Sequence, residues 1–262
     1  MEINLRKSKL KISLIYKMFI LSGLGQNKDE IPYGLIEEIK SADLIFLEYY
    51  TNFIDGETKE FLLNIRRDIN IVDRNFVELE LEKIILNNKD KKIILITSGN
   101  PLFATTHMYF IELCKKNNIE FKIINSPSIF DEIGKIGLFL YKFGRTVSIS
   151  FHESTEFYDY IIRNYKNNLH TLVLLDLDPI NNRYLDHKEA IKRLLEIDNK
   201  REKIFSENFK LIVCSNLNRK NEKIYYKEIK ELLNINLDPP ICIIIPSNLN
   251  KIELEFLLCM IS

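Results

Sequence analysis

Residues 93–101 have the sequence IILITSGNP, an unbroken apolar run that ends in a turn containing glycine and proline. Such a run is typical of a strand buried on both faces, as in a parallel sheet covered by helices. Residues 18–25 repeat the pattern as MFILSGLG, with two glycines close behind the apolar run. Both stretches therefore predict buried strands whose carboxyl ends carry glycine-containing turns.

Short apolar strands alternate with amphipathic helices on either side of these two stretches, which favours a mainly parallel α/β sheet. A helix follows Pro101, where Thr105 or Thr106 can cap the first turn. We expect Tyr109 to face the core from this helix. The strands expected here are 19–21, 44–47, 93–96 and 121–124, and the further helices are 31–42 and 76–86.

The pattern changes after residue 145, because residues 146–151 (TVSISF) alternate polar and apolar as a half-solvated strand does. We predict two α/β domains that meet near Pro127, the second with a mixed sheet. The predicted units are an N-terminal extension at 1–17, an N-terminal domain at 18–126 and a C-terminal domain at 127–262. The further elements expected are strands at 172–177, 211–214 and 241–245 and helices at 155–167, 187–197, 222–233 and 249–260.

The composition restricts the class of protein. Hydrophobic residues make up 46% and charged residues 28% of the 262 residues, which are globular values. Lys+Arg and Asp+Glu number 37 each, so the basic surplus that direct nucleic-acid binding needs is missing. No apolar run approaches the ~20 residues that cross a membrane. The four cysteines form no C-x-x-C pair and the four histidines show no metal-ligand spacing, so we expect reduced thiols, no metal and a cytoplasmic protein.

The first 17 residues carry five basic side chains around a short apolar run, Ile12–Tyr16, which is too short for a signal-peptide core. Two interpretations remain open. The segment is either a disordered or membrane-grazing extension, or it follows a start codon upstream of the real one at Met18. The strand pattern that begins at Met18 favours the second interpretation.

The glycines point to a ligand site. All eight precede residue 145, and Gly23, Gly25 and Gly99 follow predicted strands directly. Ligands of open α/β sheets bind at this edge, although plain turn chemistry explains any single glycine. A dinucleotide fingerprint is excluded because Lys28 stands where the third glycine is needed. The run from Ser98 to His107 predicts a concave set of backbone donors at a helix start.

Several collinear segments resemble the diphthine synthase family, a branch of the tetrapyrrole-methylase-like methyltransferases. Ala104-Thr105-Thr106-His107 together with Tyr141–Gly144 separates this branch from its porphyrin-modifying relatives. The resemblance extends from Met18 to the C-terminus. The other segments that carry it are Ile20–Gly25, Gly99–Pro101, Pro127–Ile129, Gly137-Leu138, Thr146–Ile149, Leu169–Leu172, Leu175-Asp176 and Asp238–Pro240.

The resemblance implies a two-domain α/β fold, a homodimer, and S-adenosyl-L-methionine bound in the cleft between the domains. It implies repeated methylation of the aminocarboxypropyl-modified histidine of translation elongation factor 2, giving diphthine and S-adenosyl-L-homocysteine. In some lineages a methyl ester also forms. By motif position the residues that line the cofactor are Gln26, Asn100, Phe103, Ser128, Ile129, Leu175, Leu217 and Ile241.

Three of these residues depart from the family, which usually has leucine at Gln26, aspartate at Asn100 and histidine at Ile241. At ~5 Å and an effective dielectric of about 20, the charge missing at Asn100 is worth at most ~3 kcal/mol. Weaker cofactor binding follows more readily than lost chemistry. Two alternatives stay open: a methyltransferase acting on a tetrapyrrole or another small metabolite, and a catalytically degenerate relative that acts as a binding protein.

Methyl transfer from a sulfonium to an amine needs little acid or base assistance, because orientation alone can contribute ~7–11 kcal/mol. We therefore assign no catalytic residue from the sequence. His107 and His170 could contact the substrate, but helix capping and packing explain them comparably well. Lys142 and Arg145 could meet an acidic partner, although a solvated face is the commoner role of such charges.

Overall fold

The first sheet has five parallel strands in the order β3-β2-β4-β1-β5, in a computed structural model that describes residues 18–50 and 52–261. Both interpretations of the segment before Met18 lie outside these described residues. The two apolar runs that decide the fold pair with each other, with Ile20 opposite Ile94. The strands are β1 (Met18–Gly23), β2 (Leu44–Glu48), β3 (Asn70–Val72), β4 (Lys92–Thr97) and β5 (Glu120–Ile124).

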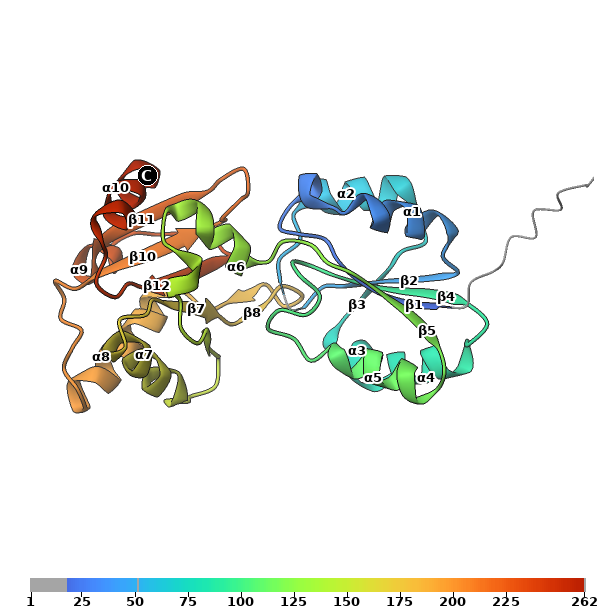
Figure 1. Cartoon of the computed structure of the whole chain (residues 1–262), viewed down its shortest axis with the longest axis horizontal. Coiled ribbons are helices and arrows are strands. Elements are labelled where there is room, and N and C mark those ends of the chain that lie inside the picture. The colour runs from blue at the N-terminus through green and yellow to red at the C-terminus, as the bar shows by residue number, and fades with distance from the viewer. Residues whose placement is uncertain (1–17, 51, 262) are drawn as a thin grey trace, which may run out of the picture.

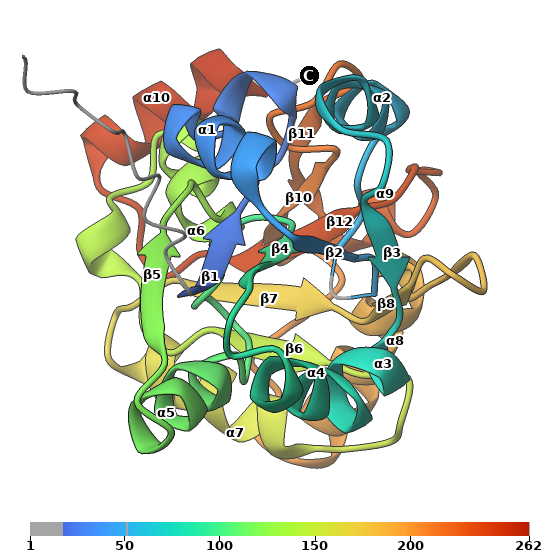
Figure 2. The same ribbon diagram turned by 90° about the vertical axis from the view of Figure 1, so that its right-hand side faces the viewer.

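Helices cover both faces of this sheet (Figures 1 and 2). Alternate strand residues such as Ile20 and Ile94 pack beneath the first two helices, whereas Phe19 and Leu95 pack beneath the other three. Burial on both faces explains why the strands are continuously apolar. The helices are α1 (Tyr33–Ser41) and α2 (Gly56–Ile65) on one face, and α3 (Arg74–Leu79), α4 (Leu81–Asn87) and α5 (Met108–Lys116) on the other.

The second sheet has the order β11-β10-β12-β7-β6 and is mixed, because β6 and β7 are parallel and the other pairs are antiparallel. The predicted fold class, a parallel sheet followed by a mixed one, is confirmed. The strands are β6 (Val147–Ile149), β7 (Thr171–Leu175), β10 (Lys210–Ser215), β11 (Lys223–Glu228) and β12 (Ile241–Ile245). The helices are α7 (Glu156–Lys166) and α8 (His187–Lys200) on one face and α6 (Ile129–Glu132) and α10 (Lys251–Met260) on the other, with α9 (Ile229–Leu232) after β11.

The helix predicted at 222–233 is wrong. Half of that stretch is β11, which pairs antiparallel with β10, and only one helical turn, α9, follows. The run Ile224-Tyr225-Tyr226 consists of β-branched and aromatic residues that favour extended backbone. Neither α2 nor the small hairpin formed by β8 (Leu177–Asp178) and β9 (Arg183–Tyr184) was predicted from the sequence.

The start of α5 also differs from the prediction. The helix begins at Met108, and His107 occupies the N-cap position without a side-chain cap bond. The Thr105 hydroxyl instead accepts a hydrogen bond from the His107 backbone N–H (3.2 Å). Tyr109 is 48% exposed and does not belong to the core, contrary to the prediction.

One segment links the halves of the chain covalently, and one loop of the second half binds the first half by hydrogen bonds. The first runs from β5 to α6, and the predicted boundary at Pro127 falls in it. The second is the loop between β10 and β11, where Arg219 donates to the backbone oxygens of Gln26 (2.9 Å) and Phe53 (2.8 Å). Hydrogen bonds donated by Arg219 therefore hold the β10–β11 loop against the first half of the chain. No helix in the described ranges is long and apolar enough to cross a membrane.

Candidate functional site

The loops after β1 and β4 are joined at the carboxyl edge of the first sheet. The Gly99 N–H donates to the Gly25 oxygen (2.9 Å). The Ser126 hydroxyl donates to the Gly99 oxygen (2.6 Å) and accepts from the Gly25 N–H (3.0 Å). Gly23 has no room for a side chain, since a Cβ there would lie 2.1 Å from the Gly99 oxygen. Three glycines thus bring three loops within hydrogen-bond distance of one another.

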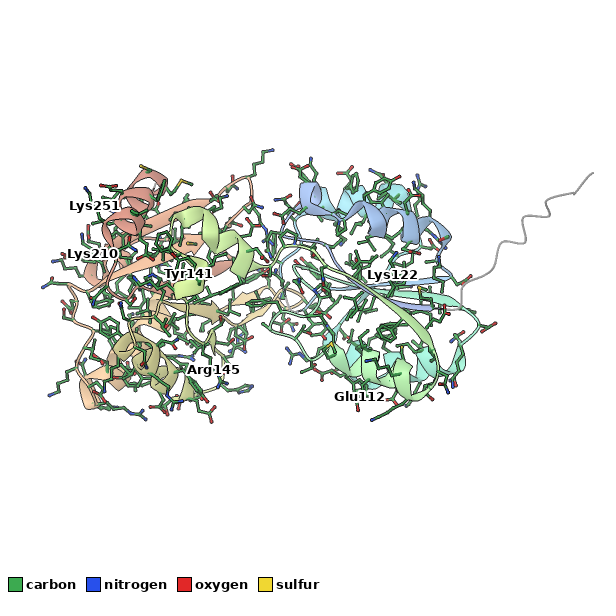
Figure 3. All side chains as sticks on the ribbon, in the orientation of Figure 1. Glu112, Lys122, Tyr141, Arg145, Lys210 and Lys251 are labelled. Atoms are coloured by element: carbon green, nitrogen blue, oxygen red, sulfur yellow. The ribbon has the colours of Figure 1, made fainter. Side chains whose placement is uncertain are left out.

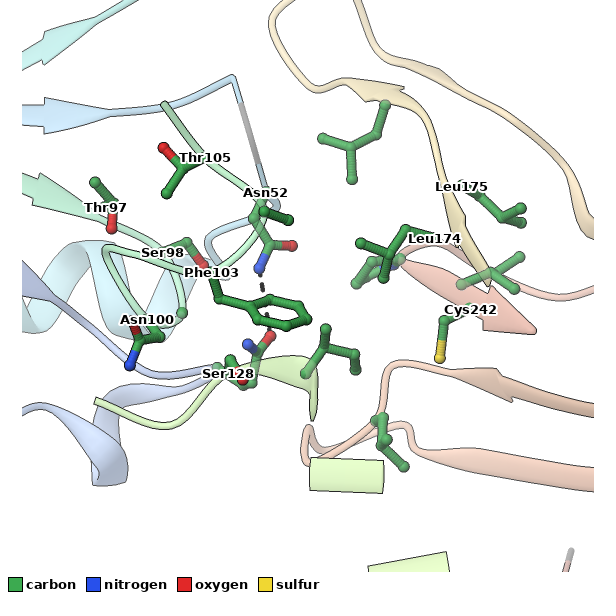
Figure 4. Close-up of a pocket in the computed structure, with 18 of the residues that line it drawn as sticks. Asn52, Thr97, Ser98, Asn100, Phe103, Thr105, Ser128, Leu174, Leu175 and Cys242 are labelled. Carbon is green, nitrogen blue, oxygen red and sulfur yellow. Dashed lines mark hydrogen bonds between the residues drawn. The ribbon is translucent and has the colours of Figure 1, made fainter. Parts of the chain in front are cut away.

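These loops form one wall of a cavity between the two sheets, which we call the cleft pocket (Figure 4). Strands β7, β10 and β12 of the second sheet provide the opposite wall. All eight residues that the sequence selected lie on this one cavity. They are Gln26, Asn100, Phe103, Ser128, Ile129, Leu175, Leu217 and Ile241.

Polar side chains on the first wall are held by their neighbours. The Asn100 amide donates to the Ser126 oxygen (3.1 Å) and its oxygen accepts from the Leu102 N–H (2.9 Å). The Gln26 side-chain oxygen accepts from Asn52 at 3.4 Å (Figure 4). Asn100 therefore joins its own loop to the segment after β5, which fixes the shape of this wall.

Phe103 and α6 form the floor between the two halves. The Phe103 ring lies 5.9 Å from the ring of Phe130, so a residue of the first half packs on the core of the second. Ser128 caps α6, because its hydroxyl accepts from the Phe130 N–H (3.1 Å) and Asp131 completes a capping box. This cap sets where Ser128 and Ile129 face the cavity.

The second wall is mainly apolar. Leu174 and Leu175 project from β7, and Cys214 and Cys242 lie directly opposite each other on β10 and β12. A hydrogen bond to Cys242 and burial raise the pKa of the Cys214 thiol. Such a wall suits an aromatic or aliphatic part of a ligand, opposite the polar loops of the first sheet.

Several lining residues were not identified from the sequence, among them Asn52 and Thr97. The wall also contains His107, which was named as a possible substrate contact, and Thr105, which was expected as a helix cap. Thr97 follows an apolar run, and its position at the end of β4 was the available signal. Its hydroxyl is buried and has no hydrogen-bond partner among the described residues. Thr97 therefore offers an unused polar contact on the cavity wall.

Arg219 strengthens the closure beside the pocket. Its guanidinium is held by the Gln26 and Phe53 oxygens, and burial lowers its pKa to about 10, against the opposing charges of Asp55 and Glu30. The side chain is therefore still charged at neutral pH. A buried cation held by backbone oxygens of the other half makes the mutual position of the two walls costly to change.

A second cavity, which we call the groove, adjoins the cleft pocket and has a volume of about 670 Å³. It is lined by polar side chains of both halves, including Tyr50, Arg74 and His152. The two cavities share four lining residues: Ala104, Leu174, Leu175 and Leu177. A small ligand in the pocket and a larger one in the groove would therefore meet at this shared border.

Comparison with known proteins shows the family to which this chain belongs. The model of the tetrapyrrole (corrin/porphyrin) methylases matches residues 18–233. Diphthine synthase of Methanococcus aeolicus is 40% identical over 244 residues, 90% of this chain and 95% of the relative. That of Methanocaldococcus jannaschii is 38% identical, over 90% and 96%. A crystal structure described as a candidate diphthine synthase of Entamoeba histolytica superposes with a TM-score of 0.82 and 29% identity, covering 94% of this chain and 99% of that one.

The chain belongs to the tetrapyrrole methylase family and is a methyltransferase. Within that family it belongs with the diphthine synthases, as its sequence motifs predicted.

Proposed function

We propose that this chain transfers methyl groups from S-adenosyl-L-methionine to the aminocarboxypropyl-modified histidine of translation elongation factor 2, giving diphthine on the route to diphthamide. Its diphthine synthase relatives match along nearly their whole length, which supports the same role. The observation that carries the proposal is the convergence of all eight motif-derived residues on one cavity.

The residues of the cleft pocket fit S-adenosyl-L-methionine, which supplies a methyl group on a positively charged sulfur. The apolar wall around Leu174, Leu175 and Ile241 suits the adenine ring. The partnerless hydroxyl of Thr97 and the loop that contains Gly99 offer polar contacts on the opposite side. We propose Gln26, Asn100, Phe103, Ser128, Ile129, Leu175, Leu217 and Ile241 as the residues that hold it.

Orientation is the main contribution of this chain to the reaction. The interlocked loops around Gly25, Gly99 and Ser126 hold one wall, and Arg219 ties the other wall to it. Fixing reactants at contact distance can provide ~7–11 kcal/mol of the barrier. We propose that the groove admits the protein loop that bears the acceptor, so that the spent donor can exchange from the pocket while the substrate stays nearby.

Two alternatives have observations in their favour. The matching family includes methylases of corrins and porphyrins, which supports a tetrapyrrole or another small metabolite as the acceptor. A catalytically degenerate relative is supported by Asn100, whose amide is already engaged by Ser126 and Leu102. Calorimetry with S-adenosyl-L-methionine distinguishes the degenerate relative from an active methyltransferase, because the degenerate relative should give no binding heat at millimolar concentration.

Transfer of a radiolabelled methyl group tests the substrate. We expect label on elongation factor 2 only when its histidine carries the aminocarboxypropyl group, and a mass spectrum then counts the methyl groups and detects any ester. Equal labelling of the unmodified factor, or labelling of a porphyrin instead, would contradict the assignment.

We also propose a cytoplasmic homodimer of two-domain subunits divided near Pro127. The outer side of α10 exposes large apolar residues, with Ile252, Phe256 and Leu258 each more than 50% exposed. Tyr141, 83% exposed, projects from the same half of the molecule (Figure 3). Apolar surface of this kind is typical of subunit contacts. Light scattering should give twice the chain mass, and Phe256→Glu should give a monomer.

A further inference from the structure

A buried acid–base pair lies behind the wall of the cleft pocket. Glu48 is the last residue of β2, and its Oε2 atom lies 2.7 Å from Nε2 of His107. The Glu48 side chain is 0% exposed and that of His107 4%. The Tyr50 hydroxyl is a second partner of this carboxylate. Two electron pairs repel each other at 2.7 Å, so the distance assigns the ring hydrogen of a neutral His107 to Nε2, beside Glu48.

This donation sets the chemistry of the other ring nitrogen. A neutral imidazole that carries its proton on Nε2 has a free electron pair on Nδ1. Nδ1 lies 2.6 Å from the Thr105 hydroxyl, which therefore donates to it. The three side chains form a directed chain, from the Thr105 hydroxyl through the ring of His107 to the carboxylate of Glu48. Thr105 and His107 line the cleft pocket, and Glu48 lies behind them.

No other side chain on the described pocket wall is as well suited to accept a proton. The lining contains one imidazole and no carboxylate. The pKa of the Cys214 thiol is raised, so it stays protonated near neutral pH. Tyr50, on the adjoining groove, also stays protonated, because burial and the charges of Glu48 and Glu78 raise the pKa of its hydroxyl.

Repeated methylation of one nitrogen makes such an acceptor necessary. Each transfer to an amine leaves a positively charged nitrogen that still carries hydrogen until three methyl groups are present. A proton must therefore leave before the first transfer and again before each later one. Free α-amino groups titrate near 7.7–8.0, so at pH 7 only on the order of a tenth of them are neutral.

We propose that Thr105, His107 and Glu48 form a proton relay that deprotonates the acceptor amine, a role that rests on the proposed function. The ammonium N–H electron pair stays on nitrogen, and its proton passes to the Thr105 oxygen. The hydroxyl proton moves to Nδ1 of His107, and the resulting imidazolium is paired with Glu48. The freed nitrogen pair then forms the N–C bond, while the C–S electron pair remains on sulfur.

The charged and titratable groups near His107 and along the adjoining groove come from several elements. Glu48 approaches from β2 and also interacts with the Tyr50 hydroxyl, and Phe110 of α5 stacks on the His107 ring at 6.2 Å without charge. Arg74 of α3 lies 5.2 Å over the ring of Tyr50 in the groove. Asp176, also on the groove, has its carboxylate engaged by the backbone N–H groups of Phe151 and Leu177. Asp73, Asp178 and His152 complete the titratable groups of the groove.

The variant His107→Gln tests the relay, because a glutamine amide can still donate to Glu48 but cannot accept a proton. We expect kcat at pH 7 to fall at least ~100-fold, the usual contribution of a general base. The deficit should shrink as pH rises from 7 to 9.5, because the amine then loses its proton to water. A matched control is His170→Gln, which alters a second buried His–Glu pair (2.9 Å) that lines neither cavity. It should leave the pH profile unchanged.

Two further measurements separate a relay from a structural role. Thr105→Val should reproduce the pH-dependent deficit, and Thr105→Ser should restore the rate, since only the hydroxyl is needed. Nitrogen-15 spectra of the ligand-free protein at pH 8 should show His107 protonated on Nε2 alone, and calorimetry should give unchanged S-adenosyl-L-methionine affinity for His107→Gln.

If the loss of kcat in His107→Gln is the same at every pH, or if the His107 ring carries its proton on Nδ1, the relay is wrong while the proposed function stays intact. Absence of methyl transfer by the unaltered protein to modified elongation factor 2 would contradict the proposed function, and the relay with it.

Discussion

Each half of the molecule contains a buried histidine–glutamate pair, and the two pairs differ in whether the group at the second ring nitrogen lines a cavity. In the first half, Nδ1 of His107 accepts from the Thr105 hydroxyl, on the pocket wall. In the second, Nδ1 of His170 accepts from the backbone N–H of Ser247 (3.0 Å), and the Ser247 hydroxyl lies 3.3 Å from the same nitrogen; Ser247 lines neither cavity. The Thr105 hydroxyl can therefore exchange a proton with a ligand in the pocket, whereas the Ser247 hydroxyl has no access to either cavity. Burial and pairing are shared, so they do not distinguish a functional pair from a structural one.

The second pair has a structural task that explains its burial. Glu253 accepts from Lys142 (2.8 Å), from His170, and from the backbone N–H groups of Phe139 and Asn250. It thereby joins the start of α10 to β7 and to the segment before β6. Removing one partner from such a network leaves buried donors without an acceptor.

The largest effect in this comparison should come from Glu253→Ala. Loss of one partner of a buried charge pair costs about 3–5 kcal/mol, so we expect a decrease of that size in the free energy of unfolding. Because the network lines neither cavity, the kcat of the folded fraction should stay within twofold. Urea unfolding and initial rates measure the two quantities. A large loss of kcat with full stability would remove the distinction between the pairs.

Low pH should remove the stabilisation that the Glu253 network provides. Burial opposes the shift, but hydrogen bonds from Lys142, His170 and backbone N–H groups lower the pKa of Glu253 from 4.5 to about 2. Its stabilisation, at most about 3 kcal/mol, is complete above pH 4.5 and is lost as pH falls toward 2. Burial also lowers the pKa of His170, so protonation of the unfolded chain adds a loss that begins near pH 6.5. Glu253→Gln should flatten the unfolding free energy between pH 2 and 4.5.

In the first half, a substitution in the interlocked loops should change the affinity for S-adenosyl-L-methionine. Ser126→Ala removes the hydroxyl that joins Gly25 to Gly99 and leaves a buried N–H and a buried oxygen unpaired. We expect a cost of about 1–3 kcal/mol, felt mainly as weaker S-adenosyl-L-methionine binding, because these loops form the pocket wall. Calorimetry measures the affinity. Ser247→Ala is the matched control, since its backbone N–H survives and the donor affinity should not change.

The sequence predicted the fold where one local signal dominated. The apolar runs at Ile20 and Ile94 needed no tertiary context, because burial on both faces leaves a continuous apolar pattern. Residues 222–233 failed because charged residues at helical spacing resemble a helix surface, while the partner strand β10 decides the extended form. Tertiary pairing of this kind is not visible in a window of ten residues.

The candidate site was predictable only through motifs. The eight selected residues come from segments far apart in the chain, and family motifs located them without any geometry. Cys214 and Cys242 were missed, because their facing positions depend on the register of β10 and β12. Glu48 was missed because a charged residue after an apolar run is typical of a strand end in solvent. Only the packing of α5 against β2 brings His107 to it.

The smallest expected effect concerns Asn100, which the motif comparison singled out as a lost negative charge. Asn100→Asp restores a carboxylate near a positively charged donor, worth at most ~3 kcal/mol at ~5 Å and an effective dielectric of about 20. The same change removes the amide that donates to the Ser126 oxygen (3.1 Å), at a cost of about 1 kcal/mol, and sets a charge against that oxygen. We therefore expect calorimetry to show S-adenosyl-L-methionine binding tightened by less than tenfold. Weaker binding would mean that the loop hydrogen bond outweighs the charge, and that Asn100 shapes the wall rather than contacting the sulfur.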